Sequence, residues 1–215
     1  MTLVKGLDVD CVLLDLDGTL LDSERAICDA AAAAFADVDV RVAELQIADH
    51  MGAPLEELYA LFVGDQDEER MRRFIKHYIE RHDAHPDRFP PPLPGVVDGL
   101  AALVARGLPL SVATTKPSAR ARSQLEGAGL ERFFRHVQGT DPGMKPKPAP
   151  DVVLHGCAAL GTAPARALMI GDTPRDVAAA RAAGTHAIVV AYSEPRVRAA
   201  RSMGADAVIT SLSEL

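Results

Sequence analysis

The sequence has no tryptophan, few cysteines and no long hydrophobic run. A membrane-spanning helix needs roughly 18 or more consecutive apolar residues, so we expect no membrane insertion and no membrane partner. The three cysteines, Cys11, Cys28 and Cys157, are odd in number and widely spaced, which is not the pattern of a disulfide framework. The opening MTLVKGLDVD lacks the basic, apolar and small-residue order of a secretory signal. These absences predict a reduced, cytoplasmic protein.

Basic residues are also in short supply. The chain has 23 lysines and arginines against 30 aspartates and glutamates, a formal net charge of -7. Because binding to a phosphate backbone requires a basic surface, we expect no nucleic-acid partner. A small anionic substrate is compatible with this charge if the site itself supplies positive groups. With 215 residues and 48% hydrophobic residues, the chain is long enough for one core and a modest insertion.

Short apolar runs alternate with helical patterns from residue 106 onward, which is typical of a parallel sheet covered by helices. The expected strands cover residues 110–114, 136–139, 166–171, 185–191 and 206–210. The expected helices cover residues 117–127, 150–160, 174–183 and 195–203. Another apolar run, residues 11–14, precedes all of these. The predicted fold class is therefore α/β with a parallel sheet.

Residues 22–90 differ, because they carry helical periodicity and no convincing strand. Five apolar residues follow the spacing of one helix face, namely Met71, Phe74, Ile75, Tyr78 and Ile79. A first helix, opened by Asp22 or Ser23, could supply its packing partner. Several prolines in residues 89–95 then stop any helix. We predict a small helical insertion at 22–90, with residues 1–21 and 91–215 forming the rest of the fold.

The stretch DLDGTL at residues 15–20 ends the first apolar run with two carboxylates, Asp15 and Asp17. Strand side chains alternate with period two, so both would point to the same side. Two like charges about 4 to 6 Å apart repel by several kcal/mol, which favours a cation beside them. Mg²⁺, which prefers carboxylates, waters and a substrate phosphate, would suit. A simple aspartate–glycine turn explains the stretch about equally well.

A second acidic group follows the expected strand 166–171. Asp172 lies in the loop after the strand, where ligand sites of open parallel sheets occur. Asp176 falls in the first turn of the next helix and could simply complete a capping box with Thr173. Asp172 adds to the carboxylates of the DLDGTL stretch and strengthens the case for a metal.

Two further stretches could bind an anion. Thr114 and Thr115 stand at a strand end before a helix, where hydroxyl and backbone N–H groups can cradle a phosphate. An ordinary helix cap is the alternative. Lys145 and Lys147 lie in the proline-stiffened run MKPKPAP, where an ammonium could offset the charge of a phosphate. Solvated loop lysines are the alternative, and physical reasoning alone leaves open which of the two points inward.

Together these blocks resemble the haloacid dehalogenase superfamily, in particular its phosphohydrolases of the phosphoglycolate phosphatase type. D-x-D-G-T-L matches Asp15 to Leu20, and the hydroxyl motif matches Thr114. The motif K-P-x-P matches Lys147 to Pro150, and G-D-x-x-x-D matches Gly171 to Asp176. The four occur in order across nearly the whole chain. The resemblance implies a Rossmann-like three-layer core with a small all-helical cap inserted after the first strand.

The resemblance also implies roles. Asp15 would attack phosphorus and form an aspartyl-phosphate, while Asp17 would protonate the leaving alcohol and then activate water. Thr114 and Lys147 would hold the transferring phosphoryl oxygens, with Gly18 and Thr115 among the substrate-binding residues. The implied Mg²⁺ site consists of Asp15, the backbone carbonyl of Asp17, Asp172 and, in support, Asp176. The cap would close over the site and exclude water.

Two details qualify the match. Lys145 also begins a K-P-x-P run, but Lys147 is followed directly by the expected helix, as in relatives. Thr115 stands where many relatives have asparagine, which weakens any claim to a specific substrate. Cap residues 50–54 could contact substrate or form a helix-opening loop.

The expected function is a Mg²⁺-dependent phosphatase acting on a small phosphorylated metabolite, as a monomer or homodimer. A sugar phosphomutase would share all four blocks and differ mainly in its cap. A dehalogenase is disfavoured because such enzymes lack the second carboxylate, which is present here as Asp17. A non-catalytic binding protein on this fold is disfavoured by the intact set of Asp15, Asp17, Lys147 and Asp172.

Overall fold

The computed structural model describes residues 2–64 and 67–215. Contacts divide the chain into two compact units. The core unit comprises Met1–Leu21 and Pro91–Leu215, and the helical unit comprises Asp22–Pro90. Each unit has its own hydrophobic core.

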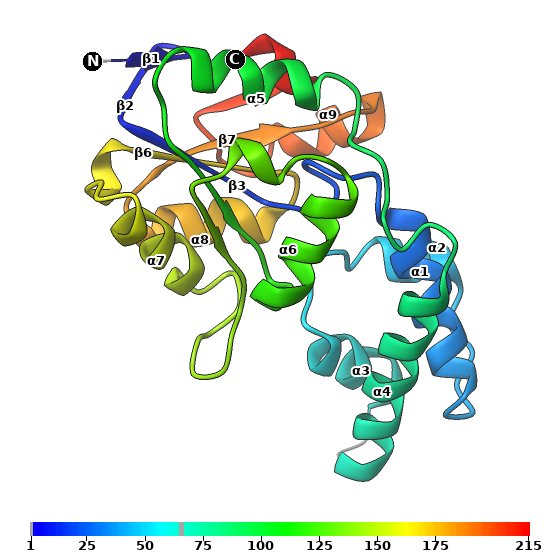
Figure 1. Cartoon of the computed structure of the whole chain (residues 1–215). Helices are drawn as coiled ribbons and strands as arrows, with labels where there is room; N and C mark the ends of the chain where they lie inside the picture. Colours follow the sequence, from blue (N-terminus) through cyan, green and yellow to red (C-terminus); the bar gives the residue numbers. More distant parts are fainter. Residues whose placement is uncertain (1, 65–66) are drawn as a thin grey trace. The chain divides into compact units, whose positions relative to one another are not determined.

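A six-stranded, all-parallel sheet forms the centre of the core unit, in the order β5-β4-β3-β6-β7-β8. Figure 1 labels β3, β6 and β7 of this sheet. Its strands are β3 (Cys11–Leu14), β4 (Leu110–Ala113), β5 (His136–Gln138), β6 (Ala167–Gly171), β7 (His186–Val190) and β8 (Ala207–Ile209). The five strands expected after residue 106 are present to within one residue at each end. The predicted α/β fold with a parallel sheet is therefore confirmed.

Helices cover both faces of this sheet, because its strands are apolar on both sides. In β3, Val12 and Leu14 pack into one cluster and Cys11 and Leu13 into the other. The first cluster includes residues of α5 and α6, and the second includes residues of α7 and α8. The core-unit helices are α5 (Val96–Ala105), α6 (Ser118–Gly127), α7 (Asp151–Ala159), α8 (Pro174–Ala183) and α9 (Glu194–Ala200), with 3-10 turns η1 (Glu131–Phe133), η2 (Pro164–Arg166) and η3 (Leu212–Glu214). This is a three-layer arrangement.

Some elements of the core unit were not predicted from the sequence. A hairpin precedes β3 and consists of β1 (Thr2–Val4) and β2 (Leu7–Val9). Its two-residue turn has positive φ at Lys5 and Gly6, which suits the right-handed twist of the flanking strands. Helix α5 was also not predicted, and the helix expected at 195–203 ends earlier, at Ala200.

The helical unit contains four helices and no strand among its described residues. They are α1 (Glu24–Ala36), α2 (Glu44–Ala48), α3 (Leu55–Val63) and α4 (Glu68–Ala84). Most of the expected apolar face of α4 packs inward, since Phe74 and Tyr78 are buried and the Phe74 ring centroid lies 4.4 Å from that of Phe35 on α1. Met71 and Ile75 are partly buried, whereas Ile79, expected on the same face, is 36% exposed. Ser23 occupies the N-cap position of α1, but its hydroxyl makes no capping hydrogen bond.

No helix in the described residues is both long and apolar enough to cross a membrane.

Candidate active site

The carboxyl ends of β3, β4 and β6 lie side by side and carry the polar residues of the candidate site. Leu14 pairs with Val112 on β4 and with Ile170 on β6, so the residues that follow these strands emerge at one edge of the sheet. The backbone N–H of Asp15 extends this register by donating to Ile170 O at 2.9 Å. The parallel sheet therefore brings together three stretches that are far apart in the sequence.

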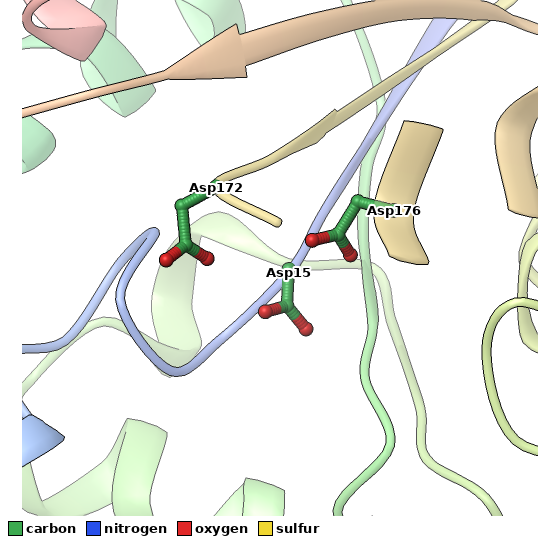
Figure 2. A group of neighbouring side chains, drawn as sticks. All are labelled: Asp15, Asp172 and Asp176. Carbon is green, nitrogen blue, oxygen red and sulfur yellow. The ribbon is translucent and has the colours of Figure 1, made fainter. Parts of the chain in front are cut away.

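Three carboxylates gather at this edge, as Figure 2 shows. Asp15 follows β3, Asp172 follows β6, and Asp176 lies in the first turn of α8. Each offers an oxygen, and the three oxygens lie within 4.8 Å of one another. These are three of the four residues expected at the metal site.

Lys147 lies among these acidic groups, and its side chain is only 3% exposed. Its Nζ donates to Asp15 Oδ1 at 2.6 Å, to Asp176 Oδ1 at 2.5 Å and to Ala113 O at 3.1 Å. Lys145, by contrast, is exposed, and its backbone N–H bonds to Asp151. Of the two lysines in the MKPKPAP run, the structure thus brings Lys147 to the carboxylates.

Burial dominates the electrostatics of the cluster. Burial raises the pKa of Asp15 to about 7; Lys147 opposes this shift, while the charges of Asp176 and Asp17 add to it. Burial, followed by the charges of Asp176 and Asp15, holds the pKa of Asp172 well above its usual range. Burial by itself would lower the pKa of Lys147, but the charges of Asp15 and Asp176 outweigh it and raise that pKa. If all three carboxylates were ionised, their negative charge would exceed the single positive charge of Lys147, which is why burial and mutual repulsion favour protonation of Asp15 and Asp172.

This donor set fits a divalent metal ion. Oxygen ligands at short mutual distances are what Mg²⁺ prefers, and a cation would stabilise the charged forms of Asp15 and Asp172, whose pKa values are raised first by burial and then by neighbouring charges. Asp176 has a second task as well, since its Oδ2 accepts hydrogen bonds from Thr173 N at 3.0 Å and Thr173 Oγ1 at 2.6 Å. Asp176 therefore makes both contacts: one oxygen forms the capping interaction considered from the sequence, and the other accepts from Lys147.

Asp172 is oriented by two residues that sequence reasoning did not single out. Thr19 Oγ1 donates to its Oδ1 at 3.1 Å, and Arg196 Nη1 on α9 donates to its Oδ2 at 3.2 Å. Gly18 makes this approach possible, because it has φ +75° and a Cβ there would collide with the Asp172 carboxylate. Thr19 belongs to the DLDGTL stretch, whereas nothing local in the sequence marks Arg196.

The carboxylate of Asp17 does not belong to the group of three. Its Oδ1 accepts a hydrogen bond from Lys116 Nζ at 2.9 Å, and the same ammonium donates to Gln124 Oε1 on α6 at 2.5 Å. Sequence reasoning missed both Lys116 and Gln124. The position of Lys116 directly after the two threonines was the one available signal.

Thr114 and Thr115 follow β4 at the same edge of the sheet. Thr114 is buried, and its hydroxyl accepts the backbone N–H of Lys116 at 3.3 Å, so its own proton can be donated elsewhere. Thr115 Oγ1 is buried and bonds to no residue in the described part of the chain. A buried hydroxyl without a partner costs about 1 to 3 kcal/mol, which fits a position that bonds a ligand or water. The first N–H of α6, that of Ser118, is already taken by Asp141 Oδ1.

Residues 50–54, considered from the sequence as possible substrate contacts, lie in the helical unit. They connect α2 to α3, and Pro54 occupies the N-cap position of α3. His50 contacts Phe62 edge-on, with ring centroids 5.7 Å apart. The segment is therefore a helix-opening loop in the structure.

Comparison with known proteins gives consistent matches along the chain. The family described as haloacid dehalogenase-like hydrolase matches residues 12–190. A probable phosphatase, IndB, of Dickeya dadantii is 36% identical over 177 residues, covering 80% of this chain and 77% of that protein. A phosphoglycolate phosphatase of Thiobacillus denitrificans is 34% identical over 188 residues, covering 83% and 81%. The crystal structure of a predicted phosphatase from Clostridium acetobutylicum aligns with a TM-score of 0.84 at 27% identity, covering 96% of this chain and 95% of that one. The chain belongs to the haloacid dehalogenase-like hydrolase family.

Proposed function

We propose that the protein is a Mg²⁺-dependent phosphatase that hydrolyses a small phosphomonoester through an aspartyl-phosphate intermediate. The observation that carries this proposal is the buried cluster in which Lys147 bonds Asp15 and Asp176, with Asp172 beside them. It combines a nucleophilic carboxylate, a fixed ammonium and ligands for a hard cation. The relatives named as phosphatases, at 34% and 36% identity, support the same function.

The chain's own residues would divide the chemistry between two steps. Asp15 attacks phosphorus while Asp17 gives a proton to the departing alcohol oxygen. In the second step, Asp17 takes a proton from water as the water oxygen attacks phosphorus and frees Asp15. Thr114 and Lys147 would hold the phosphoryl oxygens in line, and positioning and electrostatics supply most of the rate in such transfers.

Other residues would support these steps. Asp15, Asp172 and the backbone carbonyl of Asp17 would hold Mg²⁺, and Asp176 would support these ligands. When bound, the ion would neutralise charge on the transferring phosphoryl group. The hydroxyl of Thr115, which bonds to no described residue, is proposed to contact the phosphate. Gly18, whose backbone N–H donates to Leu21 O at 3.0 Å, is proposed to border the phosphate without donating to it. We assign the helical unit, residues 22–90, as the cap that selects the substrate, in keeping with the family.

The test is phosphate release from p-nitrophenyl phosphate by the purified protein. We expect turnover with Mg²⁺, loss of turnover in excess chelator, and recovery when Mg²⁺ is returned. Asp15→Asn should lower kcat by at least about 10³-fold, since removal of a nucleophile abolishes the covalent route. Mass spectrometry of the quenched reaction should detect one added phosphoryl group on the wild type and none on Asp15→Asn.

Two results would contradict the proposal. Undiminished turnover in chelator would remove the metal from the mechanism, and near-normal turnover by Asp15→Asn would remove the nucleophile. Transfer of phosphate between positions of a sugar bisphosphate, without net release, would instead establish the phosphomutase alternative. A panel of phosphorylated metabolites ranked by kcat/KM would then identify the leaving group.

A further inference from the structure

Lys116 has no part in the roles assigned above, yet it lies against one of the reacting carboxylates. It stands three residues after the last residue of β4, Ala113. Its Nζ is 2.9 Å from Asp17 Oδ1 and 2.5 Å from Gln124 Oε1. The side chains of Lys116 and Asp17 are only 10% and 14% exposed. A second ammonium therefore lies at this end of the sheet, separate from that of Lys147.

The contacts hold the Lys116 ammonium at two points. Gln124 lies on α6 and is 4% exposed, so its carbonyl oxygen is anchored by the helix. Asp17 lies in the loop after β3, 99 positions away in the sequence. Fixing a lysine side chain costs up to about 2 kcal/mol of conformational entropy, and partly burying its charge costs more. Hydrogen bonds to a charged partner offset these costs, so the Lys116 ammonium is held in a fixed position between Gln124 on α6 and Asp17.

The contact with Lys116 makes the two carboxylate oxygens of Asp17 different from each other, because Lys116 Nζ donates to Oδ1. An ammonium carries only donors, so the oxygen beside Lys116, Oδ1, is kept as an acceptor. Rotation of the carboxylate about its own bond would break the contact with Nζ. In the mechanism proposed above, the transferred proton would then be carried by the other oxygen, Oδ2.

On this geometry, and resting on the function proposed above, we propose that Lys116 is a positioning residue for the acid–base group Asp17. It sets the orientation in which Oδ2 meets the leaving oxygen. In the first step the proton on Oδ2 passes to the alcohol oxygen as its bond to phosphorus breaks and the bond from Asp15 to phosphorus forms. In the second step Oδ2 takes a proton from water as water oxygen bonds to phosphorus and the bond to Asp15 breaks. Lys116 gains and loses no proton in either step.

A competing role for Lys116 is direct binding of the phosphoryl group. The two roles differ in how they depend on the leaving group. A phosphate-binding residue would serve every ester equally, whereas a residue that positions the acid matters only when the leaving group needs a proton. Phenyl phosphate and p-nitrophenyl phosphate are suitable probes, because both are aryl phosphates and p-nitrophenolate is a far weaker base than phenolate.

The experiment compares Lys116→Met, Lys116→Arg and wild type on these two esters with Mg²⁺. We expect Lys116→Met to lower kcat/KM for phenyl phosphate by about tenfold or more. This loss is smaller than the whole contribution of general acid catalysis, because Asp17 itself is still present. For p-nitrophenyl phosphate, kcat/KM should change by less than about threefold, while kcat falls because Asp17 also serves the second step. Lys116→Arg, which keeps the charge and donors, should restore most of the phenyl phosphate activity. Lys145→Met, at an exposed lysine, is the matched control and should leave both esters unaffected.

An equal loss of kcat/KM on both esters, or no loss on either, would overturn the assignment. If Lys116→Met fails to fold by circular dichroism, Gln124→Met gives the same comparison, because it removes one anchor of the ammonium and leaves the charge. It should lower kcat/KM selectively for phenyl phosphate by a few-fold, and an unselective loss or no loss again overturns the assignment. A wild-type protein inert toward both esters would instead refute the proposed function itself.

Discussion

At the scale of single residues, the candidate site consists of paired charges that are largely buried, except for Arg196, whose side chain is 39% exposed. Lys147 bonds Asp15 and Asp176, Lys116 bonds Asp17, and Arg196 on α9 bonds Asp172. A buried ion pair adds little net stability, because desolvation offsets the attraction, but removing one partner leaves the other charge uncompensated. These side chains therefore make the site rigid, and the stability of the fold depends on their staying paired.

Lys147→Met tests this dependence. The substitution leaves Asp15 and Asp176 buried without their shared donor, so we expect the free energy of unfolding to fall by about 3 kcal/mol near neutral pH without divalent ions. Urea denaturation, followed by circular dichroism, measures the change. The matched substitution Lys145→Met, at an exposed lysine, should change stability by less than about 0.5 kcal/mol. Equal effects of the two substitutions would show that the buried pairs do not constrain the fold.

At the scale of secondary-structure elements, the C-terminal turn η3 closes one face of the core unit. Leu212 is fully buried in the first of the two clusters, and Gly99 on α5 allows its backbone to approach closely. Glu214 holds the turn from outside, since its Oε1 accepts from Thr210 N at 2.7 Å, Thr210 Oγ1 at 2.8 Å and Ser211 N at 3.2 Å. Lys5, in the first hairpin, donates to Oε2 at 3.3 Å. One carboxylate thus joins the two ends of the core unit.

Glu214→Gln should show a pH-dependent effect. The hydrogen bond from Thr210 N, with those from its hydroxyl and Lys5, lowers the pKa of Glu214 from 4.5 to about 2. Because the folded-state pKa is depressed, this stabilisation is present above about pH 4.5 and is lost as the pH falls toward 2. The side chain is 38% exposed, so solvent screening limits the effect to about 1 kcal/mol or less.

The measurement is the free energy of unfolding at pH 6 and at pH 3. The gap between wild type and Glu214→Gln should shrink at the lower pH. Glu194→Gln, which removes a partner of Arg198 in an exposed pair, is the control and should show no comparable shrinkage. A gap that widens toward pH 3 would contradict the assigned direction of the pKa shift.

At the scale of the whole molecule, the chain forms two units with separate hydrophobic cores. The core of the helical unit is built around aromatic rings, with Phe74 packed 4.4 Å from Phe35 and 5.6 Å from Tyr59 between centroids. The clusters of the core unit contain none of these residues. A cavity in the helical unit should therefore weaken that unit first.

Phe74→Ala creates such a cavity at a fully buried ring. We expect it to destabilise the helical unit by about 3 to 5 kcal/mol, since both the buried ring and its contacts are lost. Native-state hydrogen exchange should be faster in α1 and α4 and unchanged in β3, β4 and β6. Uniformly faster exchange across the sheet would show that the two units unfold as one. Tyr59→Phe, which keeps the ring, serves as a mild control.

Local patterns in the sequence were sufficient to predict most of the fold. Strands such as β7 combine apolar, β-branched residues with a glycine before them, and helices such as α8 begin with proline after a threonine and end at glycine. These signals act within a few residues and so can be recognised without tertiary contacts. Where they are weak, as in the short hairpin β1–β2 and in α5, the elements were missed. The same local patterns located Asp15, Asp17, Thr114 and Asp172 at or near strand ends.

Contacts between distant residues were decided only by the tertiary structure. The family resemblance favoured Lys147 over Lys145 in the same proline-rich run, but the contact of the Lys147 ammonium with Asp15, 132 positions away, is seen only in the folded chain. Likewise, the contact of Lys116 with Asp17 and the contact of Arg196 with Asp172 span 99 and 24 positions. The sequence by itself therefore determined most of the elements and the carboxylates at the strand ends, because periodicity and turn chemistry are local. The pairing of each carboxylate with its cation required the folded sheet, because only its parallel register brings those strand ends to one edge.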